Sequence, residues 1–156
     1  MKLVKPTLTE IKDWLLLAGE VEPLFGPMVD DPNFSDALRQ AFDKGTALSA
    51  KSPEPENALA GGVVVDPSEN EIAWLAVAKA RQRQGVGDLL LKGGLDLLSR
   101  TRPVKVVTFA PGPGQAEAAL GLYRKHGFIF HSHSGLNPAG LAVQTLVRPV
   151  AQAQRP

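Results

Sequence analysis

The chain has 156 residues, of which 44% are hydrophobic and 21% charged, and its formal net charge is +1 at pH 7. This length suits one compact domain, and the small net charge supplies no overall field that would attract nucleic acid. The absence of cysteine excludes a disulfide framework, a thiolate nucleophile and thiolate metal ligands. Because no signal peptide and no membrane-length apolar stretch is present, we expect a soluble, cytoplasmic protein without a membrane partner.

The first part of the chain predicts a short strand and two helices. Residues 1–6 partly alternate between apolar and polar side chains, and Thr7 and Glu10 have the spacing of a capping box that opens a helix. Pro23 is expected to end this helix. The pair Asp31-Pro32 then supplies an N-cap and a first-position proline for a second helix, which Gly45 ends.

Strand-like runs dominate the middle of the chain. Residues 46–51, 58–65 and 71–78 are separated by polar turns, as in antiparallel hairpins. Helical spacing of apolar residues returns over 86–100, and the valine-rich run 103–110 reads as a buried strand. A helix between two strands predicts a parallel crossover.

The last part of the chain completes the predicted fold. A helical face over 116–123 precedes two further strands, 128–133 and 141–148. We predict a single α/β (α+β) domain over 1–150, with a mixed, mostly antiparallel sheet of about seven strands and helices on both faces. Residues 151–156 are expected to form a flexible C-terminal tail.

The strongest chemical signal is the loop 82–88, Gln-Arg-Gln-Gly-Val-Gly-Asp, between a predicted strand and a predicted helix. The first N–H groups of a helix lack internal partners and the helix dipole is positive there, so such a loop can present donors to a phosphate. Gly85 and Gly87 permit close approach, and Arg81 and Arg83 add positive charge. The glycine pair alone also fits a basic surface turn. The spacing matches neither a dinucleotide loop nor a nucleotide triphosphate loop.

Two segments resemble motifs of the GNAT acetyltransferases. Gln82, Gly85 and Gly87 match the acyl-CoA signature (Gln/Arg)-x-x-Gly-x-(Gly/Ala), and residues 119–128, Ala-Leu-Gly-Leu-Tyr-Arg-Lys-His-Gly-Phe, resemble the family's tyrosine-bearing helix. The resemblance implies a GNAT-like domain that acts as an acyl-CoA-dependent N-acetyltransferase. Acetyl-CoA would be the acyl donor and a small amine or peptide the acceptor, without a metal. Ala116 stands where many members carry an asparagine that helps to hold the cofactor.

The same resemblance implies where the acyl donor binds. The backbone of one strand would pair with the pantetheine arm, and the glycine loop would bind the pyrophosphate. The residues concerned are Leu75, Ala76, Val77, Gln82, Arg83, Gln84, Gly85, Val86, Gly87 and Asp88.

Two residues are candidates for proton transfer. Tyr123, the only tyrosine in the chain, is the candidate acid because the family motif places its phenol near the cofactor sulfur. Glu71 is the candidate base, because strand alternation would put it on the same face as Leu75 and on the face opposite Trp74. The alternatives are a packing role for Tyr123 and a solvated position for Glu71.

The acceptor site and the partners are less defined. Glu20 and Glu22 stand beside the predicted helix end, where carboxylates could attract an ammonium group or simply carry surface charge. His131 and His133 share a strand face but lack a third metal ligand. A non-enzymatic acyl-CoA-binding module is the alternative function, nucleic acid is not expected as a partner, and a homodimer stays open.

Overall fold

The computed structural model describes residues 1–150, and its strands form one sheet of seven with the order β1-β2-β3-β4-β5-β7-β6. Every neighbouring pair is antiparallel except β4 and β5, so the predicted mixed, mostly antiparallel sheet is confirmed. The predicted tail over 151–156 lies outside the described residues. The strands are β1 (Lys2–Val4), β2 (Ala47–Ser52), β3 (Ala58–Asp66), β4 (Glu71–Val77), β5 (Val104–Phe109), β6 (Ile129–Leu136) and β7 (Ala142–Arg148).

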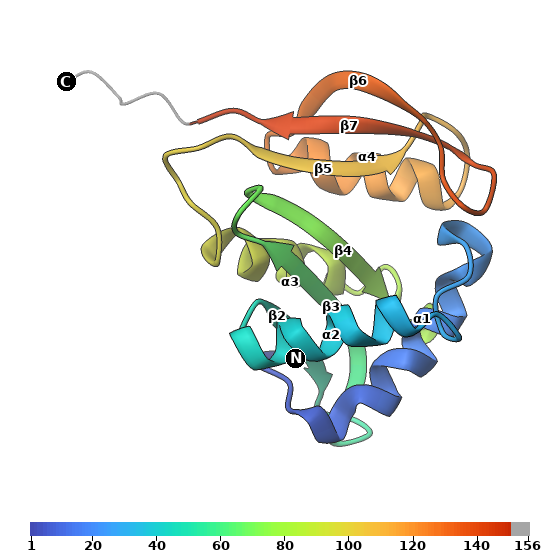
Figure 1. Ribbon diagram of the computed structural model, residues 1–156, viewed down its shortest axis with the longest axis vertical. Helices are drawn as coiled ribbons and strands as arrows, with labels where there is room; N and C mark the ends of the chain where they lie inside the picture. Colours follow the sequence, from blue (N-terminus) through green and yellow to red (C-terminus); the bar gives the residue numbers. More distant parts are fainter. Residues whose placement is uncertain (151–156) are drawn as a thin grey trace.

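Helices cover both faces of the sheet (Figure 1). Helices α1 (Ile11–Phe25) and α2 (Pro32–Lys44) pack on one face, and α3 (Val86–Asp96) and α4 (Gln115–Lys125) pack on the other. Single 3-10 turns lie at η1 (Leu8–Glu10) and η2 (Lys79–Arg81). None of the helices in the described part of the chain combines the length and the apolar character needed to cross a lipid bilayer.

The 3-10 turn η1, which leads into α1, and both ends of α2 follow the local sequence signals. The Thr7 N–H donates to the Glu10 carboxylate at 2.8 Å, which is one half of the expected capping box. Asp31 accepts a hydrogen bond from the Asn33 N–H at 2.9 Å and so caps α2. Gly45 ends that helix with a φ of 72°, a conformation that glycine adopts without steric cost.

Helix α1 does not end at Pro23, so that prediction is wrong. The helix continues to Phe25, and the Gly26 N–H closes its last turn onto the Glu22 carbonyl at 2.7 Å. A proline in the last turn removes a single backbone hydrogen bond, which the remaining bonds of that turn can tolerate. The two additional residues, Leu24 and Phe25, bring the end of the helix to the last residue of β5, Phe109, on which Phe25 stacks.

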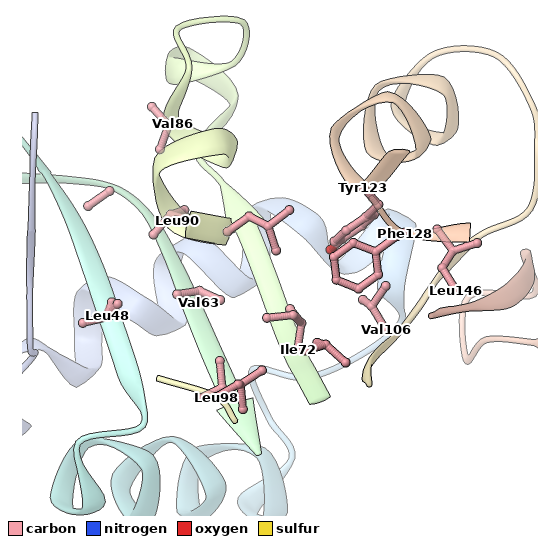
Figure 2. Close-up of a cluster of buried hydrophobic side chains, with 14 of the residues drawn as sticks. Leu48, Val63, Ile72, Val86, Leu90, Leu98, Val106, Tyr123, Phe128 and Leu146 are labelled. Carbon is pink, nitrogen blue, oxygen red and sulfur yellow. The ribbon is translucent and has the colours of Figure 1, made fainter. Parts of the chain in front are cut away.

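The two faces of the sheet carry separate cores. The larger core lies under α3 and α4 and includes Ile72, Leu90 and Val106 (Figure 2). The smaller core lies under α1 and α2 around Trp14, which is fully buried and donates its Nε1–H to the Ser49 hydroxyl at 2.9 Å. Burial of these apolar surfaces is the main favourable term that holds the helices against the sheet.

Strand β4 contains a bulge that changes which side chains face each core. Val64 of β3 pairs with Trp74, but the next residue, Val65, pairs with Ile72. Ala73 is therefore an extra residue without a partner in β3, and the alternation of side chains reverses at that point.

This bulge corrects the predicted facing of Glu71. Ile72 and Leu75 both pack against the core under α3 and α4, whereas Trp74 packs against the cores under α1 and α2. Because Glu71 precedes Ile72 without interruption, it shares a face with Trp74 and lies opposite Leu75. The prediction assumed unbroken alternation along the strand.

Strands β4 and β5 are paired over only two positions, Glu71 with Lys105 and Ile72 with Val106. Beyond them the two strands diverge, and we call this divergence the fork (Figure 1). At the closed end of the fork, Lys105 Nζ lies 3.5 Å from the Glu71 carboxylate and 3.3 Å from that of Glu69. These ion pairs lie beside the two paired positions, next to the point where the strands part.

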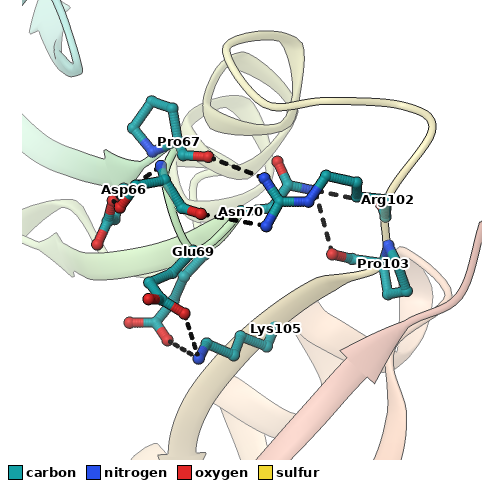
Figure 3. Close-up of polar contacts among 9 residues, drawn as sticks. Asp66, Pro67, Glu69, Asn70, Arg102, Pro103 and Lys105 are labelled. Atoms are coloured by element: carbon teal, nitrogen blue, oxygen red, sulfur yellow. Dashed lines mark hydrogen bonds and ion pairs between the residues drawn. The ribbon is translucent and has the colours of Figure 1, made fainter.

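Asn70 ties together the segments that lead into the fork (Figure 3). Its side chain is fully buried, and its Nδ2 lies 3.1 Å from the backbone carbonyl oxygens of Ser99, Arg102 and Pro103. Its Oδ1 accepts the Ser99 N–H at 2.8 Å. One side chain thus joins the turn before β4 to the segment before β5.

Replacing Asn70 with alanine should lower the free energy of unfolding by about 2–4 kcal/mol, because buried backbone groups would lose their partner. Urea denaturation measures the loss. Asn57→Ala is the matched control: Asn57 also has a positive φ, 61° against 51° at Asn70, but it is exposed and its side chain makes no hydrogen bond within residues 1–150. Equal losses in the two variants would contradict the role given to Asn70.

Candidate active site

A cleft of about 640 Å³ occupies the fork. Its walls come from β4 and β5, from the loop before α3, from α4 and from the end of α1. Beyond Ile72, the edge of β4 that faces β5 has no strand partner. Backbone N–H and C=O groups on such an edge are free to pair with an extended ligand.

The glycine loop forms one end of this cleft. Gly85 is the N-cap residue of α3 with a φ of 79°, and a Cβ placed on it would meet nothing within 4 Å. The backbone there is therefore open to a ligand, next to the unpaired first N–H groups of the helix. Gln115 Nε2 donates to Gln82 Oε1 at 2.7 Å and joins the loop to the start of α4.

Asp88, in the first turn of α3, gathers three basic side chains. Its Oδ1 lies 2.7 Å from His126 Nε2 and 3.0 Å from Lys125 Nζ, and its Oδ2 lies 3.1 Å from Lys92 Nζ. The hydrogen bond with His126, followed by those with Lys125 and Lys92, holds the pKa of Asp88 well below its usual range. The carboxylate therefore links α3 to the end of α4, which leaves its backbone N–H as the group suited to a phosphate.

Tyr123 lines the cleft from α4. The residue is only 6% exposed, its ring meets Phe128 edge to face at 5.4 Å, and Figure 2 shows the side chain pointing from α4 toward the sheet. Its hydroxyl has no hydrogen-bond partner among residues 1–150. Burial raises the pKa of Tyr123, so the phenol stays protonated over the ordinary pH range and can donate to a ligand.

The cleft brings together Tyr123 and all the predicted cofactor-contact residues except Gln84. Gln84 instead donates to the Ala80 carbonyl at 3.4 Å. The assignment of these residues to acyl-CoA stays a prediction. The structure adds that they line one continuous space.

The three predicted glutamates lie outside the cleft lining. Glu71 is 25% exposed and paired with Lys105. Glu20 accepts a hydrogen bond from the Lys79 N–H at 2.9 Å, and Glu22 accepts one from the Met28 N–H at 2.6 Å. Each carboxylate thus has a partner within the protein, and the predicted roles of Glu71 as base and of Glu20 and Glu22 in substrate binding stay predictions.

The sequence reasoning missed one wall of the cleft. Leu24 and Phe25 reach it from the end of α1, and Phe25 stacks on Phe109 of β5 with ring centres 5.4 Å apart. Because the helix was expected to end at Pro23, these two residues had no predicted place. Elsewhere, His131 and His133 are exposed on β6, and no group of three metal-ligating side chains is found within residues 1–150.

Comparisons with known proteins agree with this architecture. The family described as acetyltransferase (GNAT) domain matches residues 50–130. An acetyltransferase of the GNAT family from Bacillus cereus ATCC 10987 is 14% identical, with a TM-score of 0.72 over 97% of this chain and 98% of that chain. A ribosomal-protein-alanine N-acetyltransferase from Brucella melitensis is 16% identical, with a TM-score of 0.75 over 96% and 99%.

A third solved structure, the NatC complex bound to Gag peptide and CoA, contains a chain that is 20% identical, with a TM-score of 0.71 over 97% of this chain and 100% of that chain. At these identities the structural likeness establishes the fold alone. A search of curated proteins found no match.

Asp88→Asn should lower the melting temperature by a few degrees at pH 6–8, since 1 kcal/mol corresponds to about 2–4 °C in a domain of roughly this size. A lowered folded-state pKa means that the stabilisation is present above the unfolded pKa of about 3.9 and is lost as pH falls through the folded value. The gap between parent and variant should therefore narrow below about pH 4.

Thermal melts across this pH range check the prediction. Asp96→Asn is the control on the same helix, because Asp96 is exposed and paired only with Arg100, and it should shift the melting temperature by no more than about 1 °C. If the difference in melting temperature between the parent and Asp88→Asn did not change with pH, the ionised Asp88 carboxylate would not be the stabilising group.

Proposed function

Because the chain belongs to the GNAT acetyltransferase family, we propose that it transfers an acetyl group from acetyl-CoA to a primary amine by direct attack in a ternary complex. The observation that carries this proposal is the cleft in the fork. An unpaired strand edge, an open glycine loop at a helix start and a buried tyrosine with a free hydroxyl line one space.

The acyl donor would lie along the edge of β4. The pantetheine arm would pair with the backbone from Leu75 to Val77, which has no strand partner on that side. The pyrophosphate would accept hydrogen bonds from the first N–H groups of α3, where the helix dipole also favours an anion. Asp88 would not repel it strongly, because three basic side chains surround that carboxylate.

The transfer step balances without a covalent enzyme intermediate. The lone pair of a neutral amine attacks the thioester carbonyl carbon, and a backbone N–H of β4 stabilises the oxyanion. The C–S bond then breaks with its electron pair on sulfur, and Tyr123 donates a proton to the thiolate. The nitrogen loses one proton to water, Tyr123 regains one from solvent, and the products are the N-acetylated amine and the free CoA thiol.

Water is the proposed proton acceptor for the amine. The carboxylate that lines the cleft, Asp88, is engaged with three basic groups at the glycine-loop end. Glu71 is not part of the lining, but it directly precedes Ile72, the first residue of β4 that is. Its carboxylate is paired with Lys105. It stays the candidate base that the sequence predicted, and we infer that it would act through an intervening water.

Gly85→Glu should abolish the rise in melting temperature that acetyl-CoA produces, because the side chain and its charge would occupy the space that a phosphate needs. Thermal melts with and without acetyl-CoA measure the effect. Gly140→Glu is matched in backbone and in space, since Gly140 has a φ of 82° and also has nothing within 4 Å of an added Cβ, but it lies outside the cleft lining. If Gly85→Glu bound acetyl-CoA as well as Gly140→Glu, the donor site would be elsewhere.

Tyr123→Phe should leave the fold and acetyl-CoA binding nearly intact and should lower the transfer rate by roughly 10- to 100-fold. The ring is kept, and the lost hydroxyl has no partner within residues 1–150, so the packing cost should be small. In the parent, the raised pKa of Tyr123 means that this acid should not be titrated below about pH 10.

Steady-state release of CoA thiol, measured with one acceptor over pH 6–10 beside thermal melts, tests this role. An unchanged rate per folded molecule would make Tyr123 a packing residue. Acetyl-CoA binding without thiol release for any amine tested would instead support the non-enzymatic acyl-CoA-binding module.

A further inference from the structure

The wall of the cleft on the side of α1 is entirely neutral. It consists of apolar and aromatic side chains from α1, β4 and β5, namely Val21, Leu24, Phe25, Trp74, Val107 and Phe109. The ionisable side chains of the lining other than Tyr123 belong to the segment after β4, to the first turn of α3 and to α4; they are Arg81, Arg83, Asp88 and Lys125. The charges are thus confined to the part of the cleft assigned to the acyl donor.

No carboxylate belongs to this wall. Glu20 and Glu22 hold backbone N–H groups with their carboxylates, and Glu71 is paired with Lys105. A multiply charged amine that packed on this wall would lose hydration without contacting a counter-charge in the lining. An uncharged amine would lose much less, and the apolar surroundings favour the neutral form that attacks the thioester.

The neutral wall is also fixed in position. Phe25 stacks on Phe109, and Asn137 Nδ2 donates to the Leu24 carbonyl at 2.8 Å, which holds the end of α1 against the turn between β6 and β7. Val107 is 50% exposed in the lining, so it leaves apolar surface for a ligand to cover. A rigid aromatic and aliphatic surface binds apolar groups with little loss of its own conformational freedom.

Resting on the proposed function, we propose that the acceptor is a primary amine carried on an apolar or aromatic skeleton that packs on this wall. The neutral nitrogen attacks the thioester as described above, with the same products. Free arylalkylamines and the α-amine of a peptide with an apolar first residue share this chemistry. Polyamines and other multiply charged amines are excluded because the wall offers them no counter-charge.

The first experiment uses the parent protein with phenylethylamine, a tripeptide that begins with phenylalanine, and spermidine. Release of CoA thiol gives kcat/KM for each amine, and calorimetry in the presence of CoA gives binding without turnover. We expect at least one of the two apolar amines to exceed spermidine by about tenfold or more in kcat/KM and to bind more tightly. The better of the two shows whether the acceptor is a free arylalkylamine or the α-amine of a peptide. Spermidine as the best acceptor would overturn the inference and leave the proposed function intact.

The second experiment places a carboxylate in the wall. Val107→Glu should lower kcat/KM for the preferred apolar amine about tenfold and raise the relative rate with spermidine. Ile129→Glu makes the same change at an apolar residue on β6 that is 60% exposed and outside the cleft lining, and it should have no effect. Equal behaviour of the two variants would overturn the assignment of this wall. Acetyl-CoA binding without transfer to any amine would instead overturn the proposed function.

Discussion

The short parallel pairing between β4 and β5 is the constraint on which the rest of the structure depends. Two residue pairs join the part of the sheet that runs from β1 to β4 to the part formed by β5, β7 and β6. Because the pairing stops at Ile72 and Val106, β5 continues along β7 while the edge of β4 is left bare. The buried side chain of Asn70 joins the segments that lead into the two strands, and the ion pairs of Lys105 lie at the surface beside it.

The sheet separates two kinds of chemistry. On the side of α3 and α4, helix-start N–H groups and basic side chains surround the cleft, and the one carboxylate among them, Asp88, is hydrogen-bonded to three basic side chains. On the side of α1, aromatic and aliphatic side chains line the cleft. The cleft therefore has an electropositive part and a neutral part, which suits the proposed donor with its phosphates and the proposed acceptor without them.

Local signals were sufficient to predict the elements and the glycine loop. The N-cap at Asp31 and the stop at Gly45 depend on backbone conformations that neighbouring residues determine, so they can be predicted from sequence. The bulge at Ala73 could not, because it depends on the register between β3 and β4. The link between Asp88 and His126 was equally hidden, since 38 positions separate the two residues. The aromatic wall is also hidden from the sequence, because Pro23 indicates a helix end before Leu24 and Phe25.

The contact between Asn137 and Leu24 has a mechanical consequence. Leu24 belongs to the helix that packs on the β1 to β4 part of the sheet, whereas Asn137 follows β6 on the other part. The stacked rings of Phe25 and Phe109, at the far end of β5 from Lys105, connect the same two bodies. A hinge rotation about the closed end of the fork would have to break these contacts. The two parts of the sheet are therefore joined at both ends of the fork, and their relative motion should be smaller than if they were joined at the closed end only.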